Sequence, residues 1–156
     1  MEITKDYVMD FRKKLRILER EIGIELKNET SCCGVTLAQC HILLELNESE
    51  SLSISEIADI LGLDSSTLSR TIDGLVEKGF VTRTTDINDR RAVQLNLSEN
   101  GIKKVESINE QCNNTYREFL QFIPEDKIAS VLEVMELIAE GLKNLRKGSA
   151  GERCCP

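Results

Sequence analysis

The fold is decided by the stretch from Ser53 to Leu97, which reads SISEIADILGLDSSTLSRTIDGLVEKGFVTRTTDINDRRAVQLNL. Ser53 and Glu56 form a capping box at the start of one helix, and Gly62 is expected to end that helix. Asp64 is a good N-cap for a second helix. Apolar residues recur at helical spacing in both: Ile54, Ile57, Ala58 and Leu61, then Leu68, Ile72, Leu75 and Val76. The stretch therefore predicts a helix-turn-helix.

The second predicted helix carries a polar face opposite its apolar stripe. The first two turns hold short hydroxyls and one arginine: Ser65, Ser66, Thr67, Ser69 and Arg70. Packing alone gives little reason for so many poor helix formers. Hydroxyls and arginine can reach phosphates and base edges when a helix enters a major groove N-terminus first. A DNA-reading helix and a solvated face after an Asp cap both stay open from this face alone.

A β-hairpin is predicted after the second helix. Gly79 ends the helix, and alternating segments from Phe80 and from Ala92 are typical of strands on either side of a polar tip. The tip contains two acids and two arginines: Asp86, Asp89, Arg90 and Arg91. The arginines suit a minor groove, where negative potential is concentrated, and the acids are expected to hold an arginine by ion pairing. The hairpin favours the DNA-reading interpretation.

With these elements the sequence resembles the MarR family of winged-helix regulators, over roughly residues 5–147. The matching segments are Thr36–Gln39, Leu43–Leu44, Ile57–Ala58, Leu68–Arg70, Leu75–Gly79, Val81, Asp86, Asp89–Arg91 and Leu97–Gly101. The resemblance implies a mainly α (α+β) fold, in which a winged helix-turn-helix lobe is flanked by N- and C-terminal dimerisation helices. It also implies an obligate homodimer on a pseudo-palindromic operator in double-stranded DNA, repression as the commoner mode, and regulation by something that binds or modifies the protein.

The remaining segments are assigned around this lobe. We expect a helical dimerisation region at residues 1–35 and 98–147, the winged helix-turn-helix at 36–97, and a flexible cysteine-containing tail at 148–156. The predicted helices are an amphipathic one over residues 2–27, one capped by Thr36, one from Ser98 to about Phe122, and one opened by Pro124. The apolar stripe of the last helix is too wide for a lone surface helix, so burial by a partner is expected.

The composition of the chain indicates where in the cell the protein works and how its charge bears on DNA binding. No apolar run is long enough to span a membrane, and the N-terminus lacks the apolar stretch of a signal peptide, so a cytoplasmic protein is expected. The net charge is −7, but placement matters more than the sum. Between Asp64 and Ser98 five acids are matched by five bases: Arg70, Lys78, Arg83, Arg90 and Arg91. We therefore expect modest non-specific DNA affinity with a clear salt dependence.

Six cysteines separate the chain from an ordinary member of the resembled family: Cys32, Cys33, Cys40, Cys112, Cys154 and Cys155. In a cytosolic protein they suggest thiol chemistry or metal binding before structural disulfides, although their spacing matches no zinc finger or ribbon. The first vicinal pair is expected just before a helix N-terminus, whose dipole favours thiolate. If the tail brought the last pair to it, the thiolates would suit a soft metal or metalloid, or oxidation to a disulfide.

Alternatives to thiol sensing stay open. Cys40 is either a sensing residue or a small buried hydrophobe, and His41 is expected in the core or an interface rather than on a metal. The cysteines could be incidental in a regulator that responds to a small aromatic or phenolic ligand. A thiol enzyme is set aside, because the chain has no Cys-x-x-Cys and adjacent helical residues such as Cys40 and His41 point in different directions. No cofactor is expected to be required, apart from a thiolate-bound metal or metalloid as effector.

Overall fold

The computed structural model describes residues 3–49, 51–85 and 93–148. In chain order the elements are α1 (Lys5–Cys33), α2 (Leu37–Glu48), β1 (Leu52–Ser53), α3 (Ile54–Leu61), α4 (Ser65–Glu77), β2 (Val81–Thr85), β3 (Val93–Leu97), α5 (Glu99–Leu120) and α6 (Glu125–Gly148). Helices dominate, with one small antiparallel sheet, which confirms the predicted mainly α (α+β) fold class. The chain forms two compact units, Met1–Glu110 and Gln111–Pro156, and each is described by itself.

The sheet belongs to the first unit and has the strand order β1-β3-β2. Both pairings are antiparallel, with Leu52 opposite Leu95 and Val81 opposite Leu97. The two wing strands β2 and β3 confirm the predicted hairpin up to Thr85 and from Val93 onward. The strand β1 was not predicted, because two residues are too few to show an alternating pattern.

The helix boundaries follow the local signals of the sequence. Capping boxes are present at Thr36 with Gln39 and at Ser53 with Glu56. The Glu56 carboxylate accepts a hydrogen bond from the Ser53 backbone N–H at 2.7 Å. Its hydrogen bonds with Ser53 lower the pKa of Glu56. Gly62 ends α3 in the left-handed conformation, with φ 63°. These devices confirm the predicted starts of α2 and α3 and the turn between α3 and α4.

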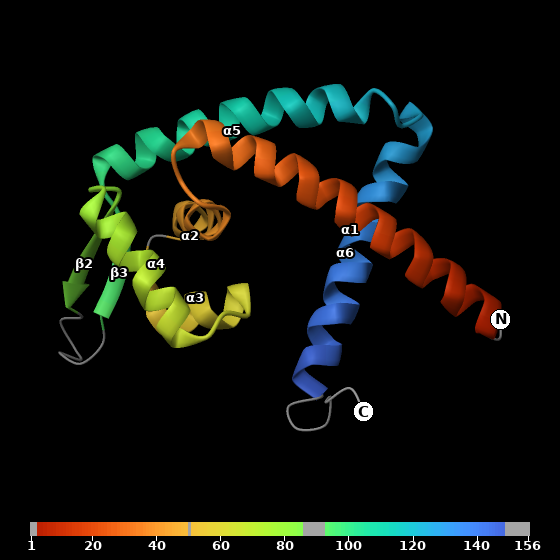
Figure 1. Cartoon of the computed structure of the whole chain (residues 1–156), viewed down its shortest axis with the longest axis horizontal. Coiled ribbons are helices and arrows are strands. Elements are labelled where there is room, and N and C mark those ends of the chain that lie inside the picture. The colour runs from red at the N-terminus through yellow and green to blue at the C-terminus, as the bar shows by residue number, and fades with distance from the viewer. Residues whose placement is uncertain (1–2, 50, 86–92, 149–156) are drawn as a thin grey trace. The chain divides into compact units, whose positions relative to one another are not determined.

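The core of the first unit lies where α2, α3 and α4 pack beside β2 and β3 (Figure 1). Its fully buried side chains are Ile42, Leu43, Ile57, Leu68, Ile72, Leu75, Val81, Leu95, Val105 and Ile108. The predicted stripe of α4 is buried at three of its four positions, and Val76 is half-buried. In α3 only Ile57 is fully buried, so this short helix contributes less to the core than its pattern suggested.

The helix α1 is longer at its C-terminal end than predicted. It continues to Cys33 and is ended by Gly34 with φ 66°, whereas the apolar periodicity stops near Leu26. Cys32 and Cys33 therefore precede the α2 N-cap, Thr36, as expected, but they are also the last two residues of α1, which the sequence did not indicate. The end of a helix presents carbonyl groups and the negative pole of its dipole, so the dipole argument for a thiolate at this pair no longer holds.

Large apolar side chains lie exposed on α1 and α6. On α1 they are Tyr7, Val8, Met9, Phe11, Ile17, Leu18, Ile22 and Ile24, and on α6 they are Leu132, Val134, Met135, Leu137, Leu142 and Leu145. Despite this apolar surface, none of the helices in the described ranges has the length and hydropathy needed to cross a membrane.

Gly101, in the first turn of α5, lies close to the backbone that follows α4. The Ser98 Oγ accepts a hydrogen bond from Gly101 N at 3.0 Å and donates one to the Gly79 carbonyl at 2.6 Å. Gly101 is buried, and a Cβ at this position would lie 2.0 Å from the Phe80 carbonyl oxygen. Because that oxygen belongs to the backbone, it cannot swing aside as a side chain would.

We expect Gly101→Ala to lower the free energy of unfolding by about 1–3 kcal/mol or more, the usual cost of overpacking. Urea unfolding followed by circular dichroism measures this change. Gly23→Ala is the matched control, because nothing lies within 4 Å of a Cβ at Gly23 and alanine is the better helix former. Equal stability of the two variants would contradict the close contact at Phe80.

Candidate DNA-binding interface

The outward face of α4 holds most of the residues predicted to contact DNA. Ser66, Thr67 and Arg70 are exposed, and Ser69 is half-buried. Ser65 begins α4, but its side chain lies outside the described part of the structure. Among the described residues, Arg70 has no hydrogen bond or ion pair, so its guanidinium is available to a partner.

Asp64 organises the first turn of α4. Its Oδ1 accepts hydrogen bonds from the backbone N–H groups of Ser66 at 3.1 Å and Thr67 at 2.9 Å. The Ser66 and Thr67 hydroxyls also donate to this carboxylate, at 2.6 and 2.7 Å. The hydrogen bond from the Ser66 hydroxyl and, to a smaller extent, the one from the Thr67 hydroxyl hold the pKa of Asp64 far below its usual range. In this state the two hydroxyls use their protons on Asp64 and keep only acceptor capacity for a partner.

An ion pair joins α4 to the wing. Arg83 on β2 donates from Nη2 to Asp73 Oδ1 of α4 at 2.6 Å. Between the wing strands, Asn96 Nδ2 donates to Thr84 Oγ1 at 3.0 Å. The ion pair ties β2 to α4, a role for Arg83 that the sequence did not indicate, and the Asn96–Thr84 bond ties the two wing strands together. The wing residues Asp86, Asp89, Arg90 and Arg91 lie outside the described residues.

The structure brings no sensing cluster together among the residues it describes. Cys40 is half-buried in α2, Cys112 is half-buried in α5, and Cys154 and Cys155 lie outside the described residues, as do the side chains of Cys32 and Cys33. Within the described ranges no three His, Cys, Asp or Glu side chains are grouped to hold a metal ion. His41 is exposed in the single chain, which excludes the core and leaves the interface as its expected place.

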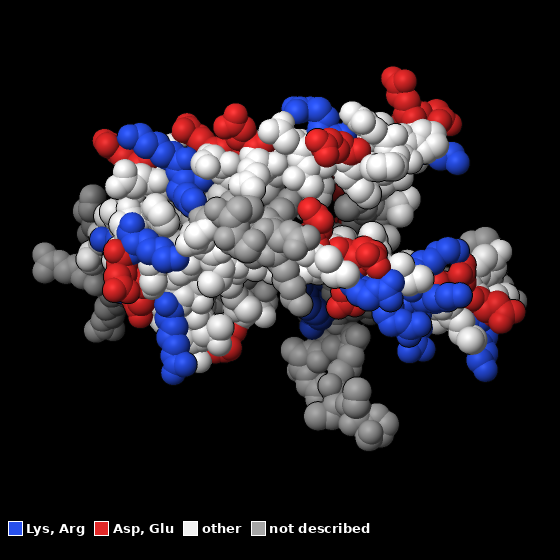
Figure 2. All heavy atoms as spheres, turned by 45° about the horizontal axis from the view of Figure 1, so that its top comes forward, with Lys and Arg blue, Asp and Glu red and all other residues white. Residues whose placement is uncertain are grey.

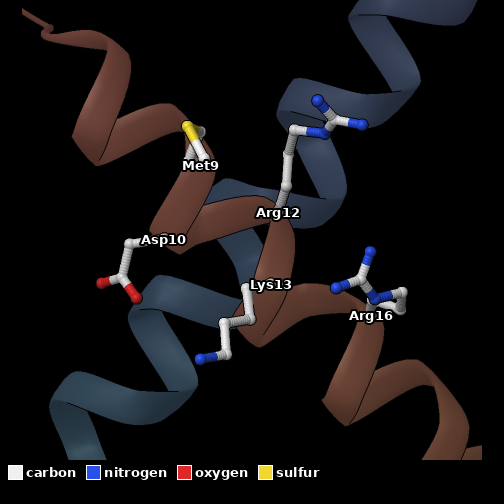
Figure 3. A pocket seen from close by; sticks show the side chains of 5 residues that line it. All are labelled: Met9, Asp10, Arg12, Lys13 and Arg16. Carbon is white, nitrogen blue, oxygen red and sulfur yellow. The ribbon is translucent and has the colours of Figure 1, made fainter.

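A pocket lies along the N-terminal half of α1 and is lined by Met9, Asp10, Arg12, Lys13 and Arg16 (Figure 3). Arg12 and Arg16 are four residues apart and extend to the same side of the helix. Asp10 forms an ion pair with Lys14, so the pocket presents more positive than negative charge. Such a lining suits an anionic group. None of its five residues is aromatic.

Charge is mixed over the face of the molecule seen in Figure 2, where lysine and arginine lie among aspartate and glutamate. The described part of the α4–wing region shows the same mixture, since Asp73 is paired with Arg83 and Asp64 lies at the start of α4. Affinity for DNA at this face would therefore depend on placed contacts rather than on a uniformly basic surface.

Acid should weaken the first turn of α4 through Asp64. Its folded-state pKa lies below the unfolded value of about 3.9, so its stabilising effect is complete above that pH and is lost as the pH falls further. We expect the Ser66 and Thr67 amides to lose hydrogen-exchange protection below about pH 4. Asp64→Asn keeps an acceptor at the N-cap but cannot titrate. An identical acid response in this variant would exclude Asp64 as the cause.

Three comparisons agree with this architecture. The model of the MarR family matches residues 35–93. The transcriptional repressor MdtR of Bacillus subtilis is 25% identical over 154 residues, covering 96% of this chain and 99% of its own length. The crystal structure of YusO from Bacillus subtilis is 28% identical, with a TM-score of 0.64, and covers 88% of this chain and 98% of YusO.

A variant of MarR from E. coli, solved in complex with operator DNA, shares the fold. Its TM-score is 0.72 at 21% identity, over 84% of this chain and 94% of that one. The family model covers α2, the helix-turn-helix and β2 and ends at Val93, the first residue of β3, and the relatives extend the match to the flanking helices. Residues 35–93 match the MarR family, and the chain is similar to an HTH-type transcriptional repressor over almost its whole length.

Proposed function

We propose that the chain is a homodimeric repressor that binds a pseudo-palindromic operator in double-stranded DNA through the exposed face of α4. The observation that carries this proposal is the division of α4 into two faces. Leu68, Ile72 and Leu75 are fully buried, while Ser66, Thr67 and Arg70 point outward at the N-terminal end. A helix held in this way can present hydroxyls and arginine to base edges in a major groove.

The exposed apolar residues of α1 and α6 support the homodimer. Soluble monomers rarely leave so many large apolar side chains in water, and a second copy of the same chain offers a matching surface. A two-fold dimer would place two copies of α4 in successive major grooves, about 34 Å apart. Arg90 and Arg91 of each wing would then enter the flanking minor grooves, with Asp86 and Asp89 as their local counter-charges.

The relatives support the mode of action. MdtR is named a transcriptional repressor, and a MarR variant was crystallised with operator DNA. By analogy this chain would bind an operator and block transcription until a signal releases it. The similar proteins are named as transcriptional regulators.

We place the signal at cysteine thiols, with a soft metal, a metalloid or an oxidant as its chemical class. The support is the pair Cys32–Cys33 at the end of α1, together with Cys154–Cys155 in the C-terminal tail and Cys40 in α2. Gly34 follows Cys33 directly, and its carbonyl accepts a hydrogen bond from Lys78 at the end of α4. Metal binding or oxidation at the cysteine pair could therefore shift Gly34 and, through its hydrogen bond with Lys78, the end of α4.

The second candidate signal is a small aromatic or phenolic ligand, with the cysteines incidental. The basic pocket of α1 favours this alternative, since Arg12, Lys13 and Arg16 would attract a phenolate or carboxylate. However, none of the residues that line this pocket is aromatic, so the pocket offers no aromatic side chain on which the ring of such a ligand could stack.

Arg70→Ala and Arg91→Ala should each weaken operator binding by about 1–3 kcal/mol, because each removes an arginine from a groove. Fluorescence anisotropy on a duplex from the DNA upstream of the encoding gene measures the affinity. Arg117→Ala, at an exposed arginine of α5, is the matched control. Unchanged affinity in Arg70→Ala would remove α4 from the interface, and unchanged affinity in Arg91→Ala would remove the wing.

Trivalent arsenic, zinc and hydrogen peroxide, titrated separately into the reduced protein on this duplex, should identify the signal. We expect one of them to release the DNA, and the response to disappear when Cys32 and Cys33 are both replaced by serine. Cys112→Ser serves as the control thiol variant. Tight binding that none of the three reagents disturbs would contradict thiol sensing, and small phenolics would then be titrated in the same assay.

A further inference from the structure

One ammonium group joins three helix ends in the first unit. Lys78, the C-cap of α4, donates from Nζ to the Gly34 carbonyl at 2.9 Å and to Gln39 Oε1 at 3.1 Å. Gly34 is the C-cap of α1, and Gln39 lies in the first turn of α2. Residues about 40 positions apart in sequence therefore meet at the corner between α1 and α2.

Gln39 is a buried polar side chain, 7% exposed, and the one polar side chain buried within the ranges that the structure describes. Its Oε1 accepts from the Thr36 backbone N–H at 3.2 Å as well as from Lys78. A carboxamide oxygen has two lone pairs, so these two donors satisfy it. Losing the Lys78 donor would leave a buried acceptor only partly satisfied, which is costly.

Gly74 of α4 lies beside the other end of the same carboxamide. A Cβ at this position would lie 2.9 Å from Gln39 Nε2, closer than side chains tolerate. The Gln39 carboxamide thus receives hydrogen bonds from Thr36 and Lys78, and the space beside its nitrogen is open only because residue 74 has no side chain.

We propose that Gln39 and Lys78 are positioning residues for DNA recognition, which set α4 against the α1–α2 corner. This proposal rests on the proposed function of α4. Lys78 lies eight residues beyond Arg70, about 12 Å along the helix at 1.5 Å per residue, away from the turns expected to contact bases. The Gln39–Lys78 junction, made of these two residues with Gly34 and Gly74, would act on DNA binding through the placement of α4.

Lys78→Met, Gln39→Met and the double variant test the junction on the upstream duplex at several salt concentrations. We expect each single change to weaken binding about tenfold, or about 1.4 kcal/mol. The double variant should weaken binding by less than the sum of the two single variants, because the Lys78–Gln39 bond is lost in both, while the bonds to Gly34 and Thr36 are each lost in only one. The slope of log affinity against log salt should stay unchanged, since no phosphate contact is lost. Lys103→Met, at an exposed lysine of α5, should bind like the wild type.

Gly74→Ala separates positioning from general stability. The added Cβ displaces Gln39, while the helix propensity of alanine offsets part of the lost stability, so DNA affinity should fall by more than the change in the urea midpoint accounts for. Affinity that follows the urea midpoint through all the variants would overturn the proposal. So would a salt slope reduced by about one in Lys78→Met alone, which would make Lys78 a phosphate contact. Additive effects of Lys78→Met and Gln39→Met would overturn it as well.

Failure of the proposed function is recognised separately. If the wild type binds the upstream duplex no better than a random duplex of equal length, operator recognition fails on that DNA. The junction is then judged without DNA, by urea unfolding of the same variants. Non-additive losses in the unfolding free energy support the junction, and additive losses overturn it.

Discussion

The burial of Leu68, Ile72 and Leu75 is the constraint on which the winged-helix lobe depends. Each side chain is fully enclosed, and burying each stabilises the fold by about 1.5–3 kcal/mol. With 3.6 residues per turn, this stripe fixes the rotation of α4 about its axis and leaves Ser66, Thr67 and Arg70 outside. Packing and recognition thus use opposite faces of one helix, so the polar face can vary in sequence without cost to the core.

Both ends of α4 are held by polar contacts of different character. At the start, Asp64 binds two backbone N–H groups and two hydroxyls, so Ser66 and Thr67 must leave the carboxylate before they can donate to DNA. The backbone bonds would keep the helix capped meanwhile. At the far end Lys78 bonds to Gly34 and Gln39. Recognition chemistry is therefore concentrated at one end, and positional control at the other.

Local signals in the sequence were sufficient for most of the helix-turn-helix. Ser53 with Glu56, Gly62 and Asp64 act within three or four residues, so their roles could be predicted and are confirmed. Contacts between distant residues could not: Arg83 with Asp73 and Lys78 with Gly34 exist only after the chain has folded. The predicted end of the first helix, at residue 27, was wrong for a related reason. Residues 27–31 are polar and without apolar periodicity, and the helix stop is set later by Gly34.

The exposure of α1 links assembly to the position of α4. Within residues 5–26, where its side chains are described, none is buried in the single chain, although many are large and apolar. Most helical stability in proteins comes from packing of an apolar face, so a helix of 29 residues with this exposed surface would be stabilised further by a partner. If that partner is a second copy, as proposed, the order of α1 depends on dimerisation. The C-cap of α1, Gly34, carries the carbonyl that Lys78 binds. A change in the position of α1 would therefore act directly on the end of α4 through this hydrogen bond.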